Sequence, residues 1–541
     1  MMTTARDIHS VNTFPLLGRL GVCLVLLFFF FLPLATYGQT WEENQDAGTI
    51  NIADGLEYKA EIQATASDGK TPLWLNANRY GLSSLDDMNG YVRGALIRPL
   101  CSDSLRRWGV GYGVDAAVTE GFTSRLVVQQ AFAEVRWLYG VLTIGSKQQH
   151  LELKNQELST GSQTFGINAR PVPQVRLSLP DYWVIPKTNG WLRVKGHIAY
   201  GKTTDDRWQK DFVTYPARYT ENTLYHSKAG YLMIGNPERY MPVSVELGLE
   251  MACQFGGKSY YNDEMAQGGT GLSSFIHAFI PGGTDATDGD YKNAEGNHLG
   301  SYVARVNLDQ ETWGASLYAD QFFEDNSMSV HLAYNGYGEG ETAWQHVKRR
   351  YFIYNFNDWM LGGEVKLKYA NWLNGVVIEY LTTKYQGGPT YHDVTGNRGE
   401  HITGLDNYYN HHLYTGWQHW GQVMGNPLYL SPIYNGDGRI IVEDNRFQAI
   451  HLGISGQPDD NLHYRLLATW RSGLGSYYHV YPKAKRNISV MAEANYKFSD
   501  TSALKGWSVK GAVGMDNGKW VGNNFGAQIT VAKQGLVSCF D

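Results

Sequence analysis

The segment from Tyr408 to Tyr434 carries the side chains best suited to bind a ligand. Its tyrosines and tryptophans are interleaved with asparagine, glutamine and histidine. Flat aromatic faces stack on the apolar CH faces of sugar rings, while amide and imidazole groups hydrogen-bond the hydroxyls. This pattern predicts a polysaccharide contact, for which the candidates are Trp417, Trp420, Tyr414 and His411. The alternative is that the same rings pack a loop against the rest of the protein.

A second candidate group lies in a proline-punctuated stretch. Asn168, Arg170 and Arg176 surround Pro171 and Pro173, which remove backbone donors and disfavour both helix and central strand. An arginine fork can bind a carboxylate through two hydrogen bonds, which would suit the uronate or pyruvate groups of an acidic polysaccharide. Pairing of the arginines with acidic residues of the protein itself is an equal alternative. Weaker candidates of the same kind are His226 and Lys228.

No spacing in the chain predicts a metal site or a catalytic centre. His411, His412 and His419 lie close in sequence, but adjacent histidines do not easily converge, and no acidic residue completes a recognised ligand spacing. Ser159 and Ser162 lack the G-x-S-x-G elbow, and carboxylate pairs are too frequent to specify glycoside hydrolysis. We therefore expect a protein that is not an enzyme and needs no metal or cofactor.

The chain that must position these residues has 541 residues and a formal charge of -6. This weakly acidic balance provides no basic surface for nucleic acid, and the composition is not that of a disordered chain. Glycine (61), tyrosine (36) and tryptophan (16) are abundant and proline (17) is scarce, which is typical of β proteins. A mean hydropathy of -0.36 excludes a polytopic helical membrane protein. It allows a membrane barrel, because alternate strand residues can be polar.

The N-terminus predicts export. An apolar run at residues 22–32 follows two arginines and precedes small residues, and it is too short to span a bilayer as a helix. We expect a signal peptide over residues 1–38 and a transmembrane barrel with long loops over residues 39–541. The mature chain keeps an odd number of scattered cysteines, which predicts neither a disulfide framework nor a metal cluster.

Alternation of apolar and polar residues recurs along the mature chain, which fits either a soluble sandwich or a membrane barrel. Close-set charges on the polar faces, such as Arg193 with Lys195, favour a barrel lumen. Tryptophan and tyrosine near strand ends favour the girdles of a membrane barrel. The clearest expected strands are 56–65, 108–119, 191–200, 243–251, 302–309, 313–320, 364–369, 463–470, 488–498, 507–516 and 525–532, and weaker ones lie near Tyr91, Gln130, Val376 and Ile450.

About 16 to 18 strands of roughly 9 to 11 residues leave most of the chain to loops. Long insertions are expected at residues 148–183, 203–242, 254–300 and 385–445, and loops of this length are usually functional. Within residues 205–219 of the second insertion, Trp208, Phe212 and Tyr215 recur at helical spacing and predict a short amphipathic helix outside the membrane.

Five ordered segments resemble a known family. They are LSTGSQTFGINARPVPQVRL (158–177), LYHSKAGYLMIG (224–235), QFFEDNS (321–327), EYLTTKYQGGP (379–389) and DNYYNHHLYTGWQHWGQVMGNPL (406–428). They are similar to the signature stretches of the Wzi-type capsule assembly family, in its Bacteroidetes-like branch. The terminal Asp541 departs from the aromatic residue that ends many outer-membrane proteins.

The resemblance implies an all-β, antiparallel outer-membrane barrel of about 18 strands, with a loop plug and short periplasmic helices. It implies a lectin-like protein of the Gram-negative outer membrane that binds capsular or exopolysaccharide and attaches it to the cell surface. The expected partners are this polysaccharide, outer-membrane lipid and other capsule-export components, with no nucleic acid, and the expected state is a monomer. A substrate-selective porin, suggested by the charged lumen alone, is the alternative function.

Overall fold

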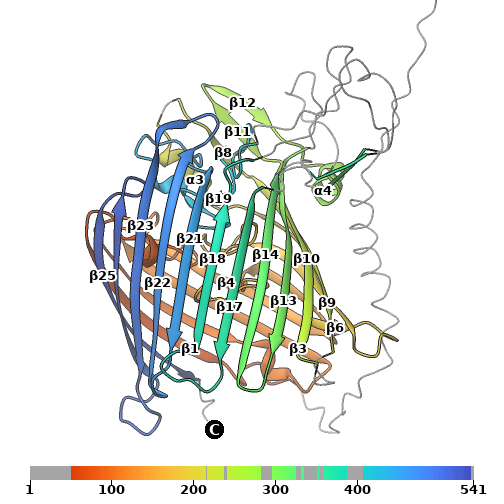
Figure 1. Cartoon of the computed structure of the whole chain (residues 1–541), viewed down its shortest axis with the longest axis vertical. Helices are drawn as coiled ribbons and strands as arrows, with labels where there is room; N and C mark the ends of the chain where they lie inside the picture. Colours follow the sequence, from red (N-terminus) through yellow and green to blue (C-terminus); the bar gives the residue numbers. More distant parts are fainter. Residues whose placement is uncertain are drawn as a thin grey trace, which may run out of the picture.

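The computed structural model describes residues 50–214, 216–236, 241–281, 295–324, 357–386 and 406–537, and the backbone of 330–333 and 350–353. Its main body is a closed antiparallel barrel of 18 strands (Figure 1). The first strand, β1 (Glu57–Asp68), pairs with β2 (Met88–Arg98) on one side and with the last, β25 (Asn524–Leu536), on the other. This ring confirms the expected fold class. The expected signal peptide, 1–38, lies outside the described residues.

All of the expected strands are present, and three further strands complete the barrel: β5, β6 and β9. The remaining barrel strands are β3 (Trp108–Glu120), β4 (Leu126–Trp137), β5 (Gly140–Ser146), β6 (Gln174–Val184), β7 (Leu192–Lys202), β9 (Leu224–Ile234), β10 (Val243–Phe255), β13 (Asn297–Asp309), β14 (Trp313–Glu324), β17 (Trp359–Leu367), β18 (Gly375–Thr382), β21 (Phe447–Gly456), β22 (Leu462–Gly475), β23 (Val480–Lys497) and β24 (Trp507–Gly518). The expected insertions 148–183 and 203–242 are therefore shorter than predicted, because they contain β6 and β9.

Alternate residues of the strands face opposite sides of the barrel wall. In β17, Leu361 and Val365 are exposed on the outside. Glu364 is buried inside, where Arg305 of the neighbouring wall donates to its carboxylate at 2.6 Å. Lys195 also faces inward, with its ammonium 2.5 Å from Glu152. These positions agree with the lumen predicted from the alternation. None of the helices in the described ranges is long and apolar enough to cross a membrane.

The two ends of the barrel differ. The end that holds the start of β1 and the close of β25 carries short turns, and the other end carries the long connections (Figure 1). We call them the short-turn end and the long-loop end. In outer-membrane barrels the short turns face the periplasm. A small sheet of β8 (Tyr219–Glu221), β11 (Lys258–Tyr261) and β12 (Glu264–Gln267) stands at the long-loop end.

Short helices lie at both ends of the barrel. Helix α3 (Asp206–Phe212) follows β7, and α4 (Leu272–Phe279) lies between β10 and β13, both in connections at the long-loop end. The 3-10 helix η2 (Leu100–Asp103) lies between β2 and β3 at the short-turn end. The predicted helix is present as α3, in which the rings of Trp208 and Phe212 stack with centroids 4.8 Å apart, and Tyr215 lies outside the described residues.

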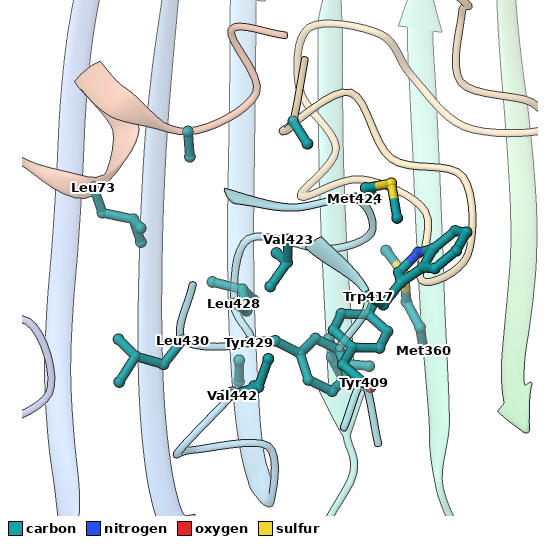
Figure 2. Packing of buried hydrophobic residues seen from close by; sticks show 14 of the residues in the cluster. Leu73, Met360, Tyr409, Trp417, Val423, Met424, Leu428, Tyr429, Leu430 and Val442 are labelled. Carbon is teal, nitrogen blue, oxygen red and sulfur yellow. The ribbon is translucent and has the colours of Figure 1, made fainter. Parts of the chain in front are cut away.

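Three loops fold into the barrel and fill much of its interior. We call residues 69–87, 147–173 and 406–446 the plug. Its apolar centre is shown in Figure 2, where Tyr409 and Tyr429 lie side by side. Their ring centroids are 4.0 Å apart, and neither residue is accessible to solvent. The barrel therefore encloses a packed core of its own loop residues.

Buried charges of the wall fasten the plug. The Lys154 ammonium of the plug lies 2.8 Å from the Asp320 carboxylate of β14, and both groups are inaccessible. In β18, Glu379 accepts hydrogen bonds from the Ser159 hydroxyl at 2.5 Å and the Thr160 backbone N–H at 2.8 Å. Removing one partner of such a buried pair typically costs about 3 to 5 kcal/mol, because the other charge is left uncompensated. The plug is thus built as part of the folded barrel.

The register of β9 places two predicted binding residues outside the lumen. His226 pairs across from Tyr200, and Lys228 lies two residues further along the same outward face. Helix α4 covers them: the Lys228 ammonium donates to the Phe279 carbonyl, and the rings of His226 and Phe279 lie 5.7 Å apart. His226 and Lys228, the weaker candidates for binding an acidic polysaccharide, therefore contact α4 and do not face the lumen.

Candidate functional site

The tip of the plug is a very short hairpin. β19 (Gln418–His419) pairs with β20 (Gln422–Val423), and Trp420 and Gly421 form the two-residue turn between them. Both turn residues have positive φ, 56° for Trp420 and 80° for Gly421. This is the pattern of a type I′ turn, in which asparagine followed by glycine is preferred. A left-handed conformation costs a residue with a side chain roughly 1 to 2 kcal/mol, so Trp420 is not the residue that the turn itself selects.

Contacts from two segments hold Trp420 at this tip. Its backbone N–H donates to Asp205 at 3.1 Å, and its ring N–H donates to the Thr204 hydroxyl at 3.3 Å. The Arg170 guanidinium lies over the ring, 4.3 Å from its centroid, and also donates to the hydroxyls of Thr123 and Ser124. Burial lowers the pKa of Arg170 to about 10, which leaves it charged at neutral pH. The indole remains partly exposed.

His419 joins the hairpin to the rest of the plug. Its Nε2 accepts the Thr204 backbone N–H at 3.1 Å, so the ring proton is on Nδ1, which lies 2.8 Å from the Arg170 carbonyl. The side chain is almost completely buried, and burial lowers its pKa. A neutral imidazole is therefore a structural link between the plug segments.

Trp417, three residues earlier, has different surroundings. It is 1% exposed, and its indole N–H donates to the Thr164 carbonyl at 2.9 Å. Its ring stacks on Tyr225 of β9 with centroids 5.8 Å apart. Figure 2 shows the indole among the residues of the buried cluster. These contacts make Trp417 a packing residue of the plug, whereas Trp420 presents its ring at the surface.

The other predicted residues fall into separate places. Asn168 is buried, its amide donates to the Val423 carbonyl at 3.1 Å, and its oxygen accepts from Asn78. Tyr414 and His411 have ring centroids 5.3 Å apart, and the Tyr414 hydroxyl donates to the Gly256 carbonyl. Burial lowers the pKa of His411 well below its usual value. Across the described residues, no group of three or more histidine, cysteine and acidic side chains could hold a metal ion.

A cavity of about 420 Å³ lies between the plug and the wall formed by β6, β7 and β9. Arg170, Arg176 and Trp417 line it, so the structure brings three of the predicted residues to one space. Its lining also includes Gln174 and His197, which the sequence analysis did not select. His197 was recognisable as a polar-face residue of its strand, but only the fold shows that it shares a cavity with Arg176.

Comparisons with known proteins find no matching family model and no relative among curated proteins. Among solved structures, the chain is similar to Wzi of Escherichia coli, described as an outer-membrane protein involved in group 1 capsule assembly and a carbohydrate-binding β-barrel. The TM-score is 0.53 at 14% identity, over 90% of this chain and 86% of that one. The chain shares the fold of an outer-membrane barrel.

Porin structures from Pseudomonas aeruginosa are also similar, at lower scores. OprD matches with a TM-score of 0.42 and 9% identity, over 90% of this chain and 96% of that one. OccD3 (OpdP) matches with a TM-score of 0.43 and 9% identity, over 91% and 94% of the two chains.

Proposed function

We propose that this protein is an outer-membrane lectin-like barrel that binds capsular or related exopolysaccharide and attaches it to the cell surface. The observation that carries the proposal is the plug, because it fills the barrel with a packed aromatic core and presents Trp420 at its tip. A pore-forming barrel keeps a water-filled lumen, whereas here Tyr409, Trp417 and Tyr429 are inaccessible inside the barrel. Support also comes from the five resembling segments and from the similarity to a carbohydrate-binding barrel.

The proposed contact is the Trp420–Arg170 pair at the long-loop end. A partly exposed indole provides a flat surface for the CH face of a sugar, and the adjacent guanidinium adds charge for an acidic one. Thr204 and Arg170 hold the ring and Asp205 holds the backbone of Trp420, in a left-handed conformation that is unfavourable for a residue with a side chain. Backbone strain of this kind is common where a side chain has a binding role.

The test uses cells that lack the native gene and carry wild-type protein, Trp420→Ala or the control Trp372→Ala. Trp372 is an exposed tryptophan in the turn between β17 and β18, at the short-turn end. At equal surface levels of protein, we expect Trp420→Ala to retain less polysaccharide per cell and Trp372→Ala to retain the normal amount. Normal retention by Trp420→Ala would reject this ring as the contact.

Conductance of the purified barrel in planar bilayers distinguishes the two functions. A plugged lectin-like barrel should show little steady current, because the plug is fastened by buried ion pairs such as Lys154 with Asp320. Regular open steps of wild-type protein, together with no binding of the purified surface polysaccharide, would favour the substrate-selective porin instead.

A further inference from the structure

The cavity beside the plug has the size of a ligand site. At about 420 Å³ it falls within the roughly 300 to 1,000 Å³ that small-molecule sites occupy. It extends along the wall from Gln174 and Tyr225 towards Asp181 and Tyr231, which are nearer the short-turn end. His150 and Asp181 of its lining are exposed, so the cavity is connected to solvent.

The cations of its lining are Lys147, Arg170, Arg176 and Lys195, and they differ in their partners. Lys147 is paired with Glu134 at 2.6 Å, and Lys195 with Glu152 at 2.5 Å. Arg176 makes no hydrogen bond or ion pair with any residue in the described part of the chain, although it projects from the wall into the barrel. A guanidinium inside a protein is normally paired, because its desolvation is otherwise uncompensated. Glu152 attracts Arg176 but is bonded to Lys195, so the hydrogen-bond donors of Arg176 face the cavity without a protein acceptor.

Two polar groups beside Arg176 also lack partners. His197 is 7% exposed, and its Nε2 is buried without a hydrogen bond to any described residue. The side-chain oxygen of Gln174 is buried and unpaired in the same way. Because buried polar atoms are nearly always hydrogen-bonded in folded proteins, these two atoms mark positions at which a ligand rich in hydroxyl groups would be bound.

Aromatic rings form the remaining wall. Phe165 belongs to the plug, and Tyr225 and Tyr231 project inward from β9. Such faces suit the CH surface of a pyranose ring. We propose that this cavity binds a single carboxylated sugar ring, with the carboxylate on Arg176 and the hydroxyls on His197 and Gln174. The choice of a sugar rests on the proposed polysaccharide binding, whereas the anion site rests on the unpaired Arg176.

The experiment measures binding of glucuronate to the purified, detergent-solubilised full barrel by isothermal titration. Glucose and acetate are tested in parallel, since one has the ring without the carboxylate and the other the carboxylate without the ring. We expect glucuronate to bind at least about tenfold more tightly than either, because a charge-assisted contact and the ring contacts must both be satisfied. Equal affinity for glucose would overturn the role of the carboxylate, and equal affinity for acetate would reduce the site to a general anion site.

Arg176→Gln should weaken glucuronate binding at least about tenfold and leave the weak binding of glucose unchanged. The matched control is Lys366→Gln, which removes one inward-facing cation that lies outside the cavity and is largely exposed. Because Arg176 has no partner in the described structure, the thermal midpoint of Arg176→Gln should not fall. Unchanged glucuronate affinity, or a fall in the midpoint that shows Arg176 to be a structural residue, would refute the proposal.

The outcome can be separated from that of the proposed function. Loss of glucuronate binding in Arg176→Gln with normal retention by Trp420→Ala would support the cavity and reject the Trp420 surface. Reduced retention by Trp420→Ala with no glucuronate binding to wild-type protein would support the Trp420 surface and reject the cavity.

Discussion

The Arg170 guanidinium lies 4.3 Å from the centroid of the Trp420 ring, although 250 residues separate the two in sequence. Arg170 comes from the loop between β5 and β6, and Trp420 from the loop between β18 and β21. Their contact joins two plug segments at the point where an indole remains accessible. Cation–π contacts contribute about 0.5 to 2 kcal/mol, so the pair both stabilises the tip and orients its ring.

Replacing Trp420 by asparagine should separate folding from binding. Asparagine tolerates the left-handed conformation of this turn better than tryptophan does, which offsets the lost contact with Arg170. We expect the free energy of unfolding to change by less than about 1 kcal/mol, measured by chemical denaturation, while polysaccharide binding falls. Loss of stability without loss of binding would assign the ring to packing alone.

Trp417→Ala should affect the plug and not the surface. Removing a buried tryptophan typically costs about 3 to 5 kcal/mol, and here the hydrogen bond to Thr164 and the stack on Tyr225 are lost too. Hydrogen exchange across residues 406–446 should accelerate, and the conductance of the purified barrel should rise. Trp420→Ala is the control and should change hydrogen exchange and conductance only slightly. Identical hydrogen exchange in wild type and Trp417→Ala would contradict the packing role of Trp417.

A change of polarity should impair membrane insertion at one residue of β7 and have little effect at its neighbour. Val194 faces outward and Lys195 inward, where its ammonium contacts Glu152 and the ring of Tyr182. Val194→Arg should cost about 2 to 4 kcal/mol if it lies near the middle of the membrane, whereas Lys195→Leu should change membrane insertion little. The measurement is the folded fraction in lipid vesicles, scored as the heat-sensitive band on a denaturing gel. Similar losses in both variants would show that this strand is assigned to the wrong face.

The plug should loosen in mild acid. Burial lowers the pKa of His419 in the folded state, so the unfolded segment binds a proton more readily. The stabilising effect of the neutral ring is therefore complete above a pH of about 6.5 and declines as the pH falls below that value. Protonation also ends its hydrogen bond from Thr204. Hydrogen exchange of residues 406–446, corrected for intrinsic rates, should be faster at pH 5 than at pH 7.5, and His419→Gln should reduce that difference.

Alternation predicted the strands whose inner and outer faces differ clearly, and β3 matches its predicted range almost residue for residue. β6 was missed because Pro180 and a register shift between Leu179 and Trp183 interrupt the pattern. β9 was missed because His226 and Lys228 are polar but face outward, where the alternation of a membrane barrel predicts apolar residues. Their covering by α4 is a long-range contact that local sequence does not contain.

The candidate site could be predicted only in part for the same reason. The aromatic segment and Arg170 were found from residue types, but Trp417 and Trp420 could not be told apart by spacing. Their difference depends on the turn at Trp420 and on the position of Tyr225 in the wall. Arg176 lacks an ion pair because the nearby carboxylates Glu134 and Glu152 are bonded to Lys147 and Lys195. These pairs join different strands and loops, so the sequence alone does not predict them.

The placement of α4 affects the outer surface of the barrel. Below the helix, the outward residues Leu247 and Ile234 are exposed and apolar, while above them α4 covers His226 and Lys228 with protein. Leu272 and Ile276 of α4 are themselves exposed and apolar, so the apolar surface on this side continues from the strands onto the helix. A neighbouring molecule that approaches beside β9 and β10 therefore meets a helix and not only strands, which distinguishes this side of the barrel in the plane of the membrane.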